Sequence, residues 1–173
     1  MHIFVKSERS CRMTTEGNYH AAQLVRQIRA VRQEIEELSG QTLNEVLAIQ
    51  PTNTLFQLGT HIAGSARFWA ITNTGGTDFH RDRDAEFMAT GSPSELVANL
   101  DELIQQISDH VSKLTAEQLD QPVSIASASF SNWDEPGLIP QRHALLHAIA
   151  HTALHLGHIQ LTRQVLGIAP LGE

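Results

Sequence analysis

The sequence predicts an all-α protein folded as a four-helix bundle, with a long connection before the last helix. Three observations support this prediction. Apolar residues recur at helical spacing along four long stretches, capping residues, prolines and glycines stand at their ends, and no stretch has a credible strand pattern. A length of 173 residues suits one domain. We expect residues 13–173 to form that domain and residues 1–12 to form a weakly structured N-terminal arm.

The first helix is expected over residues 17–39, because its apolar residues follow one another at spacings of four and three and so form one stripe. Thr14 or Thr15 can cap its start, and Gly40 suits the position after its end. A short turn of helix is expected to follow at 42–49. The stripe consists of Leu24, Ile28, Val31, Ile35 and Leu38.

The second helix is expected to begin after Pro51, with Thr52 or Asn53 as its cap, and to run to about residue 73. Its end is marked by the turn-forming sequence Asn73-Thr74-Gly75-Gly76. Two long helices and the turns between them are thus expected in the first half of the chain.

The third helix has the clearest start in the sequence. Ser92 is suited to cap it, Pro93 to its first position, and Glu95 to complete a capping box. Thr115 and Gln118 repeat the capping-box pattern and predict a brief helix.

Residues 121–140 lack helical periodicity and include three prolines and Trp133. A connection of this length inside a compact domain is often functional, and we expect it to shape a pocket. The last helix is expected to begin after Pro140 and to run to Leu166, before Gly167.

The composition is acidic and unusually rich in histidine. The formal charge is −7, and ten histidines stand beside only 12 lysines and arginines. An acidic chain is unlike a general nucleic-acid binder, which carries a basic patch. Neither a signal peptide nor a membrane-spanning stretch is evident, and Cys11 has no partner for an intrachain disulfide. The expected location is therefore the cytoplasm.

Half of the histidines fall within sixteen residues of the last helix. At 100° per residue they share an arc of about 120° on its surface. Because apolar residues cover both this arc and the opposite side, the helix is expected to be buried nearly all round, with Gln160, Arg163 and Gln164 as its wet surface. The five residues are His143, His147, His151, His155 and His158.

Buried imidazoles need partners, since one unsatisfied buried polar group costs roughly 1–3 kcal/mol. Water, buried hydrogen bonds or a metal ion can meet that need, and histidines four residues apart can both reach one divalent ion. His61 is the best candidate for a third ligand, because it points with the apolar face of the second helix. His20 is a weaker candidate for the pocket. The remaining histidines are treated as surface residues: His2, His80 and His110.

Several kinds of site are excluded by missing motifs. The chain contains no H-E-x-x-H of the common metalloproteases and no E-x-x-H of ferritin-like di-iron proteins. It also contains neither a P-loop motif nor the G-x-S-x-G of α/β-hydrolases.

The last helix resembles the signature of the DinB/YfiT-like superfamily. The matching residues are Leu145-Leu146-His147, His151, His155, Gly157-His158 and Arg163. In the second helix, His61 followed by Phe68-Trp69 is also similar to this family. The resemblance covers roughly residues 17–167 and implies a four-helix bundle with a metal ion between the second and last helices.

The resemblance implies that His61, His151 and His155 are the metal ligands. His147 and His158 would then lie next to the site, where they could orient a ligand or relay a proton. Many members of the family have Gln where this chain has His158, and the Gly-His form is similar to a branch that includes mycothiol-linked proteins.

Three functions are open for a chain with this resemblance. The leading hypothesis is a metal-dependent enzyme that transfers a low-molecular-weight thiol to small electrophiles during stress or detoxification. The alternatives are a hydrolase that uses metal-bound hydroxide and a bundle that binds metal without catalysis.

The cofactor is expected to be one divalent transition metal, with a low-molecular-weight thiol as a second cofactor in the leading hypothesis. A site of three imidazoles suits zinc or nickel, and also iron or copper. A homodimer formed through a bundle face is expected, because the last helix is apolar on two sides.

Overall fold

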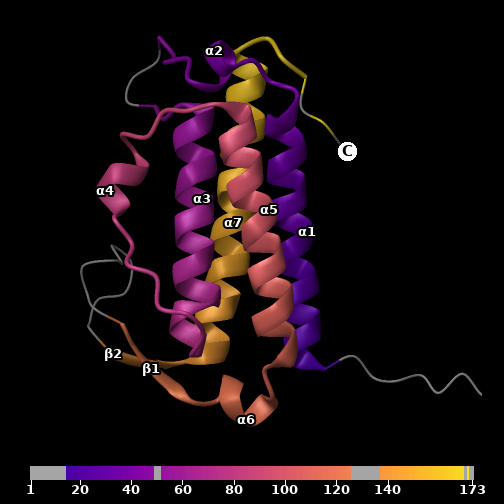
Figure 1. Ribbon diagram of the computed structural model, residues 1–173, viewed down its shortest axis with the longest axis vertical. Coiled ribbons are helices and arrows are strands. Elements are labelled where there is room, and N and C mark those ends of the chain that lie inside the picture. Colours follow the sequence, from indigo (N-terminus) through magenta and orange to yellow (C-terminus); the bar gives the residue numbers. More distant parts are fainter. Residues whose placement is uncertain (1–14, 49–51, 126–136, 170, 172–173) are drawn as a thin grey trace, which may run out of the picture.

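The computed structural model describes residues 15–48, 52–125, 137–169 and 171, and within them four long helices form a bundle (Figure 1). The predicted all-α fold is confirmed. The long helices are α1 (Glu16–Glu36), α3 (Leu55–Ala70), α5 (Pro93–His110) and α7 (Gln141–Val165). The short helical elements are α2 (Gly40–Leu43), α4 (Arg83–Glu86), α6 (Ala116–Leu119) and the 3₁₀ turns η1 (Thr72–Thr74) and η2 (Val111–Lys113).

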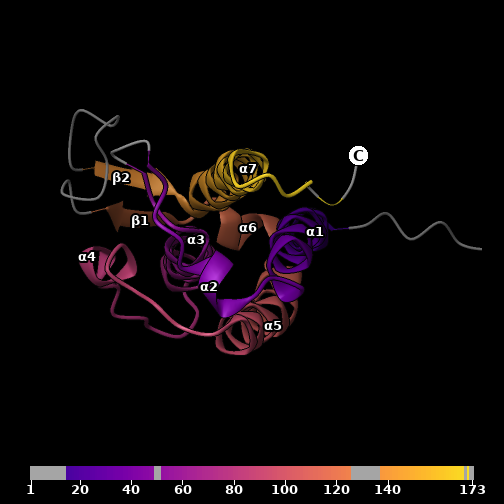
Figure 2. The same ribbon diagram turned by 90° about the horizontal axis from the view of Figure 1, so that it is seen from above.

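The helices are arranged so that α1 packs against α5 and α7, while α3 packs against the same two helices from the other side (Figure 2). In Figure 1, α1 and α7 run upward and α3 and α5 run downward. Because α3 and α5 are parallel, the chain between them must cross back along the outside of the bundle. This crossover passes through α4, which lies beside α3.

The core lies between the four helices and is built from the stripes that the sequence predicts. Every member of the first stripe except Leu38 is buried, and Leu38 packs against the core from its edge. The largest fully buried side chain is the indole of Trp69 on α3. The four stripes therefore converge on one core, as expected for a bundle.

The helix starts follow the predicted capping chemistry at three positions. Thr15 caps α1, and Ser92 and Thr115 form capping boxes at α5 and α6. The predicted cap of α3 is wrong by one or two residues: Thr54 caps it, because Gln57 at the third helical position completes a capping box there.

Two other boundaries also differ from prediction. Gly40 does not follow the end of the first helix; α1 ends at Glu36, and Gly40 begins α2, which Ser39 caps. The second helix ends at Ala70 rather than about residue 73, and a 3₁₀ turn covers the remainder.

The connection before α7 contains a small hairpin that the sequence analysis missed. Strand β1 (Pro122–Ile125) pairs antiparallel with β2 (Gly137–Pro140), so that Val123 lies opposite Ile139. Strands of four residues are too short to show a clear alternation, and prolines at their ends hide it further. Residues 1–14 and Trp133, to which two predictions refer, lie outside the described residues.

Helix α7 is less buried than its composition predicts. Four of its apolar side chains are about half exposed: Leu146, Leu154, Leu161 and Val165. Arg163, which was predicted to be solvent-exposed, is buried. Arg163 is held by a buried carboxylate on α1: its Nε lies 3.0 Å from Oε2 of Glu34. The same carboxylate accepts hydrogen bonds from the side chain of Gln160 and the backbone of Leu171. This ion pair joins α1, α7 and the residues after α7.

No helix in the described part of the chain combines the length and the apolar character needed to span a membrane.

The Glu34–Arg163 pair gives a stability prediction. Replacing Arg163 with Met leaves the Glu34 carboxylate buried without its countercharge, so we expect the free energy of unfolding to fall by about 3–5 kcal/mol. Urea denaturation followed by circular dichroism measures this loss. The exposed Arg29→Met on α1 is the matched control and should change the same quantity by less than about 0.5 kcal/mol. A loss below about 1 kcal/mol for R163M would contradict the assignment of this pair as a structural tie.

Candidate metal centre

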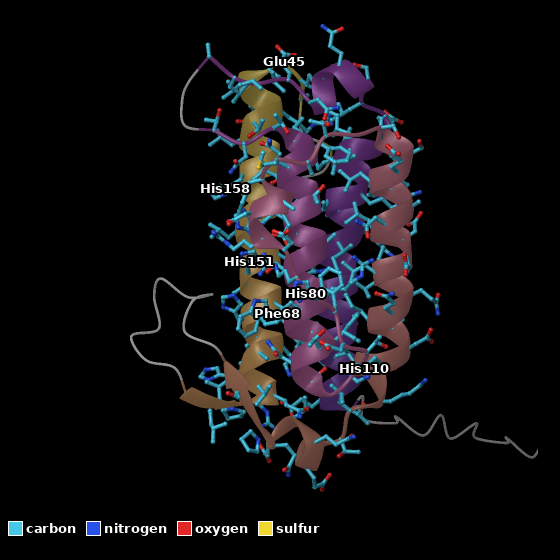
Figure 3. The ribbon with its side chains drawn as sticks, turned by 60° about the vertical axis from the view of Figure 1, so that its left-hand side comes forward. Glu45, Phe68, His80, His110, His151 and His158 are labelled. Atoms are coloured by element: carbon cyan, nitrogen blue, oxygen red, sulfur yellow. The ribbon has the colours of Figure 1, made fainter. Side chains whose placement is uncertain are left out.

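Helices α3 and α7 bring three histidines together at one place. His61 on α3 and His151 and His155 on α7 each offer a ring nitrogen, and these three nitrogens lie within 4.8 Å of one another. The pair on α7 is four residues apart and therefore projects from one face of the helix. Figure 3 shows His151 on this helix, below the level of His158. The convergence that the sequence analysis expected is present.

The three imidazoles contact one another directly, in tilted or T-shaped arrangements. The Nε2 atoms of His61 and His151 are 3.2 Å apart. The ring centroid of His155 lies 4.7 Å from that of His61 and 4.4 Å from that of His151. His61 is buried, and the two histidines of α7 are half-buried, so the cluster is partly accessible where α7 contributes to it.

The surroundings keep the two α7 imidazoles neutral. Burial, as the largest cause, together with the neighbouring His155, His61 and His147 lowers the pKa of His151 to about 2. Burial and His61 also lower the pKa of His155 to about 4. At neutral pH these rings therefore keep a lone pair, which is the form that binds metal ions.

The donor set fits a single divalent transition metal. Three imidazoles so close together would leave nitrogen lone pairs facing one another, and a metal ion removes that conflict by accepting them. Nδ1 of His151 is buried and has no hydrogen-bond partner in the described part of the chain, so only its Nε2 is engaged. These three histidines could therefore hold a metal ion; their role as ligands stays a prediction.

A buried carboxylate contacts the ring nitrogen of His61 that does not face the cluster. Oε2 of Glu86 lies 2.8 Å from Nδ1 of His61. Arg81 donates to both oxygens of the same carboxylate, from Nε at 2.7 Å and from Nη2 at 2.8 Å. Although burial by itself raises the pKa of Glu86, the hydrogen bonds from Arg81 and His61 outweigh it and lower that pKa. An ionised carboxylate only accepts, so the proton of His61 lies on Nδ1, and Nε2 faces the cluster with its lone pair.

Helix α3 leaves room for this carboxylate by having a glycine at its surface. A Cβ atom at Gly64 would come within 2.1 Å of Oε1 of Glu86. The carboxylate thus lies in a hollow that any side chain would fill. The short helix α4 presents it there, with Asp82 as the cap that accepts from the backbone of Ala85.

The crossover also covers the outer face of His61. The ring of Phe87 lies 4.6 Å from that of His61, centroid to centroid, and the guanidinium of Arg83 lies 5.2 Å from the Phe87 centroid. His61 is therefore enclosed by a carboxylate behind and an aromatic ring beside it, with only its Nε2 side directed to α7.

The two histidines predicted beside the site lie there. Nδ1 of His158 is 3.2 Å from Nδ1 of His155, which leaves Nε2 of His155 for the cluster. The His147 ring lies 5.5 Å from that of His151 and 4.6 Å from that of Trp69. His158 is exposed and His147 is half-buried, so both stand between the cluster and solvent.

Comparison with known proteins identifies the family. The model of the DinB superfamily matches residues 23–159 of this chain. The chain belongs to the DinB superfamily. No curated protein matches the chain significantly.

Solved structures share the fold of this DinB-superfamily chain at low sequence identity. YfiT from Bacillus subtilis, described as a probable metal-dependent hydrolase with an unusual four-helix bundle topology, is 20% identical, with a TM-score of 0.68 over 88% of this chain and 89% of its own. A DinB-like protein from Bacillus cereus is 15% identical, with a TM-score of 0.71 over 92% and 98%. A conserved protein from Enterococcus faecalis is 15% identical, with a TM-score of 0.68 over 90% and 99%.

The remaining histidines lie apart from the cluster. His20 is buried on α1, where its Nε2 lies 3.3 Å from a carboxylate oxygen of Glu16, so it belongs to the local packing of that helix. His80 and His143 are exposed, and His2 lies outside the described residues. The prediction of a surface role for His110 is wrong: it is half-buried, and its Nε2 lies 2.8 Å from Oγ1 of Thr74.

Arg81 and Glu86 are not predicted from the sequence. Both lie on the crossover, where no periodic pattern assigns a side chain to the core, and Glu86 is 25 residues from His61. One general rule points to such a partner: a histidine that binds metal through one ring nitrogen donates a hydrogen bond from the other, often to a carboxylate. The rule predicts an acceptor for His61 but does not indicate which residue of the sequence provides it.

The Glu86 contact gives a test by metal affinity. Glu86→Gln replaces a charged acceptor of the His61 proton with a neutral one, so zinc affinity should fall by about 10–100-fold. Competition with a chromophoric chelator measures the dissociation constant. Gly64→Ala fills the hollow from the α3 side and should weaken zinc binding in the same direction, while the exposed Glu45→Gln should leave it unchanged. Zinc affinity of E86Q within twofold of the original protein would show that the carboxylate does not support the ligand.

Proposed function

We propose that this DinB-superfamily protein is a metal-dependent enzyme that acts on a small molecule, with His61, His151 and His155 as the ligands of one divalent transition metal. The observation that supports the proposal is the convergence of three imidazole nitrogens within 4.8 Å, open on the side of His147 and His158. When bound by three neutral imidazoles, such an ion supplies Lewis-acid chemistry and ionises a coordinated water or thiol near neutral pH.

Hydrolysis is the reaction that we propose first. YfiT, which shares the fold over most of both chains, is described as a probable metal-dependent hydrolase. Water needs no binding site of its own beyond the open position, whereas thiol transfer also needs a site for the thiol. The leading hypothesis from the sequence therefore becomes the alternative that the experiment separates from hydrolysis.

The chain's own residues have distinct roles in this proposal. Glu86 and Arg81 hold the His61 ring in one tautomer and orientation. His158 is exposed and contacts His155, and is therefore placed to pass a proton between the centre and solvent. His147, packed on the Trp69 ring, limits the open side.

Activity with and without a thiol tests the proposal. The protein, purified without a histidine tag and loaded with zinc or nickel, should hydrolyse 4-nitrophenyl acetate, and His151→Ala should lose both bound metal and turnover. The exposed His80→Ala is the matched control and should keep both. Elemental analysis measures the metal, and release of nitrophenolate measures turnover.

Three outcomes separate the alternatives. Turnover that requires glutathione or another small thiol, measured with 1-chloro-2,4-dinitrobenzene as the electrophile, would support thiol transfer instead of hydrolysis. A chelator that lowers the melting temperature, with no turnover of any electrophile, would support a non-catalytic metal-binding bundle. H151A that keeps metal and activity would overturn the assigned centre.

We also propose that the protein forms a homodimer through the exposed face of α7. Three apolar side chains, Leu154, Leu161 and Val165, are about half exposed, and at 100° per residue they lie within about 40° of one another on the helix. Gly157 lies along the helix between Leu154 and Leu161 but about 40° to one side of the stripe, and the space around it is open. A flat apolar stripe with a small residue beside it suits close packing against a second copy related by a twofold axis.

Sedimentation velocity tests the dimer. Leu154→Glu places a charge in the centre of the stripe and should convert the dimer to monomer at micromolar concentration, because an unpaired charge is costly in an apolar contact. Exposed Leu138 on β2 lies outside the stripe, so Leu138→Glu is the control and should remain dimeric. A monomer at all concentrations of the original protein would exclude this interface.

A cytoplasmic location also remains our proposal, based on Cys11, the single cysteine of the sequence, which has no partner for an intrachain disulfide.

A further inference from the structure

A cavity separate from the histidine cluster lies between α3, α5 and the loop after η1. Its volume is about 770 Å³, within the range of small-molecule sites. At 100° per residue, Arg67 in its wall is about 120° around α3 from His61, so the cavity faces a different side of the helix from the metal centre. Figure 3 shows His110, another lining residue, far from His151.

The wall of this cavity contains a cation that the protein itself neutralises poorly. The side chain of Arg67 is only 12% exposed, and the carboxylate within ion-pair distance in the described chain, that of Glu102, is 3.9 Å away and 65% exposed. The guanidinium donates from Nε to Gln106 and from Nη2 to the carbonyl of Asn99. Nη1 has no hydrogen-bond partner among the described residues. A desolvated cation with a free donor favours an anionic partner.

The Gln106 side chain is fixed by its neighbours. Its Nε2 donates to Oε1 of Glu102 at 2.8 Å, so its Oε1 is the atom that accepts from Arg67. The guanidinium is therefore held in one orientation before any ligand arrives.

An aromatic wall stands next to the guanidinium. The guanidinium carbon of Arg67 is 5.7 Å from the ring centroid of Phe79. The backbone N–H of Phe79 donates to Oγ1 of Thr72, whose hydroxyl donates to the carbonyl of Thr77. The turn that permits this fold-back contains Gly75 at φ +80°, in the left-handed region. Side chain and loop are thus pre-organised, with Ile71 as a further apolar surface.

The far wall adds an apolar surface and a neutral ring. The Thr74 hydroxyl donates to the carbonyl of Ala70, so it accepts from Nε2 of His110. Burial, with Lys113 nearby, lowers the pKa of His110, and the ring adds no positive charge at neutral pH. Leu114 completes the apolar lining.

The charges on the rim disfavour a multiply charged anion. Three exposed carboxylates, those of Asp78, Glu102 and Asp109, line the cavity, against the cations of Arg67 and Lys113. Phosphate esters and polycarboxylates would meet more repulsion than attraction here.

We propose that this cavity binds a small organic monocarboxylate with an aromatic or apolar body, its carboxylate on the Arg67 guanidinium and its body against Phe79. The inference does not rest on the proposed enzymatic function, because the site shares no residue with the metal centre.

Titration of isotope-labelled protein with phenylacetate, followed by nuclear magnetic resonance, tests the site. The Arg67 side-chain N–H and the backbone amides of residues 77–79 should shift, with a dissociation constant of about 1 mM or lower. Phenylacetamide, which lacks the charge, should bind at least about tenfold more weakly. Inorganic phosphate should produce no comparable shifts.

Variants separate the roles of charge and ring. Arg67→Gln should weaken phenylacetate binding by at least about tenfold, and the exposed Arg29→Gln should leave it unchanged. Phe79→Ala keeps the charge and should also weaken binding, so the proposal stays testable if R67Q does not fold. His151→Ala should bind phenylacetate normally.

Three results would overturn the proposal. These are an absence of shifts up to about 20 mM phenylacetate, equal binding of phenylacetamide, and loss of binding in H151A. The last result would place the carboxylate at the metal centre instead.

Discussion

The packing of the crossover against α3 depends on the carboxylate of Glu86, which is buried between Arg81 and His61. It neutralises the guanidinium of Arg81 in the crossover, accepts a hydrogen bond from the buried imidazole of His61, and occupies the hollow left by Gly64. Removal of any one partner would leave a buried charge or a buried donor unsatisfied. The crossover is therefore joined to the bundle by electrostatics at the same place where the histidines converge.

The fold could be predicted from periodicity because four helices each bury one apolar stripe. Capping boxes at Ser92 and Thr115 located two of the helix starts within a residue. The convergence of the histidines on α3 and α7 was also foreseeable, since helical spacing decides which side chains share a face. The hairpin was not, because its four-residue strands show too little alternation to be read from sequence.

Buried charges could not be predicted, because their partners are distant in the chain. Arg163 was expected on a wet surface, yet Glu34, 129 residues away, makes its burial possible. Glu86 lies in a segment without helical periodicity, and the composition of that segment does not mark it as buried. A polar residue is buried only when the fold supplies its partner, and a single sequence does not reveal which distant residues meet. The exposed leucines of α7 follow the same rule in reverse: a hydrophobic residue can stay outside.

The histidine cluster combines residues that are near His61 in the sequence with residues that are far from it. His61, Arg81 and Glu86 lie within 25 residues of one another, whereas His151 comes from 90 residues away. Loop-closure entropy grows with the length of chain between contacts, so the nearby half can form while α7 is still remote. The ring on α3 is then already oriented when the last helix docks. During synthesis the same order is imposed by the ribosome, because α3 and the crossover emerge well before the last helix.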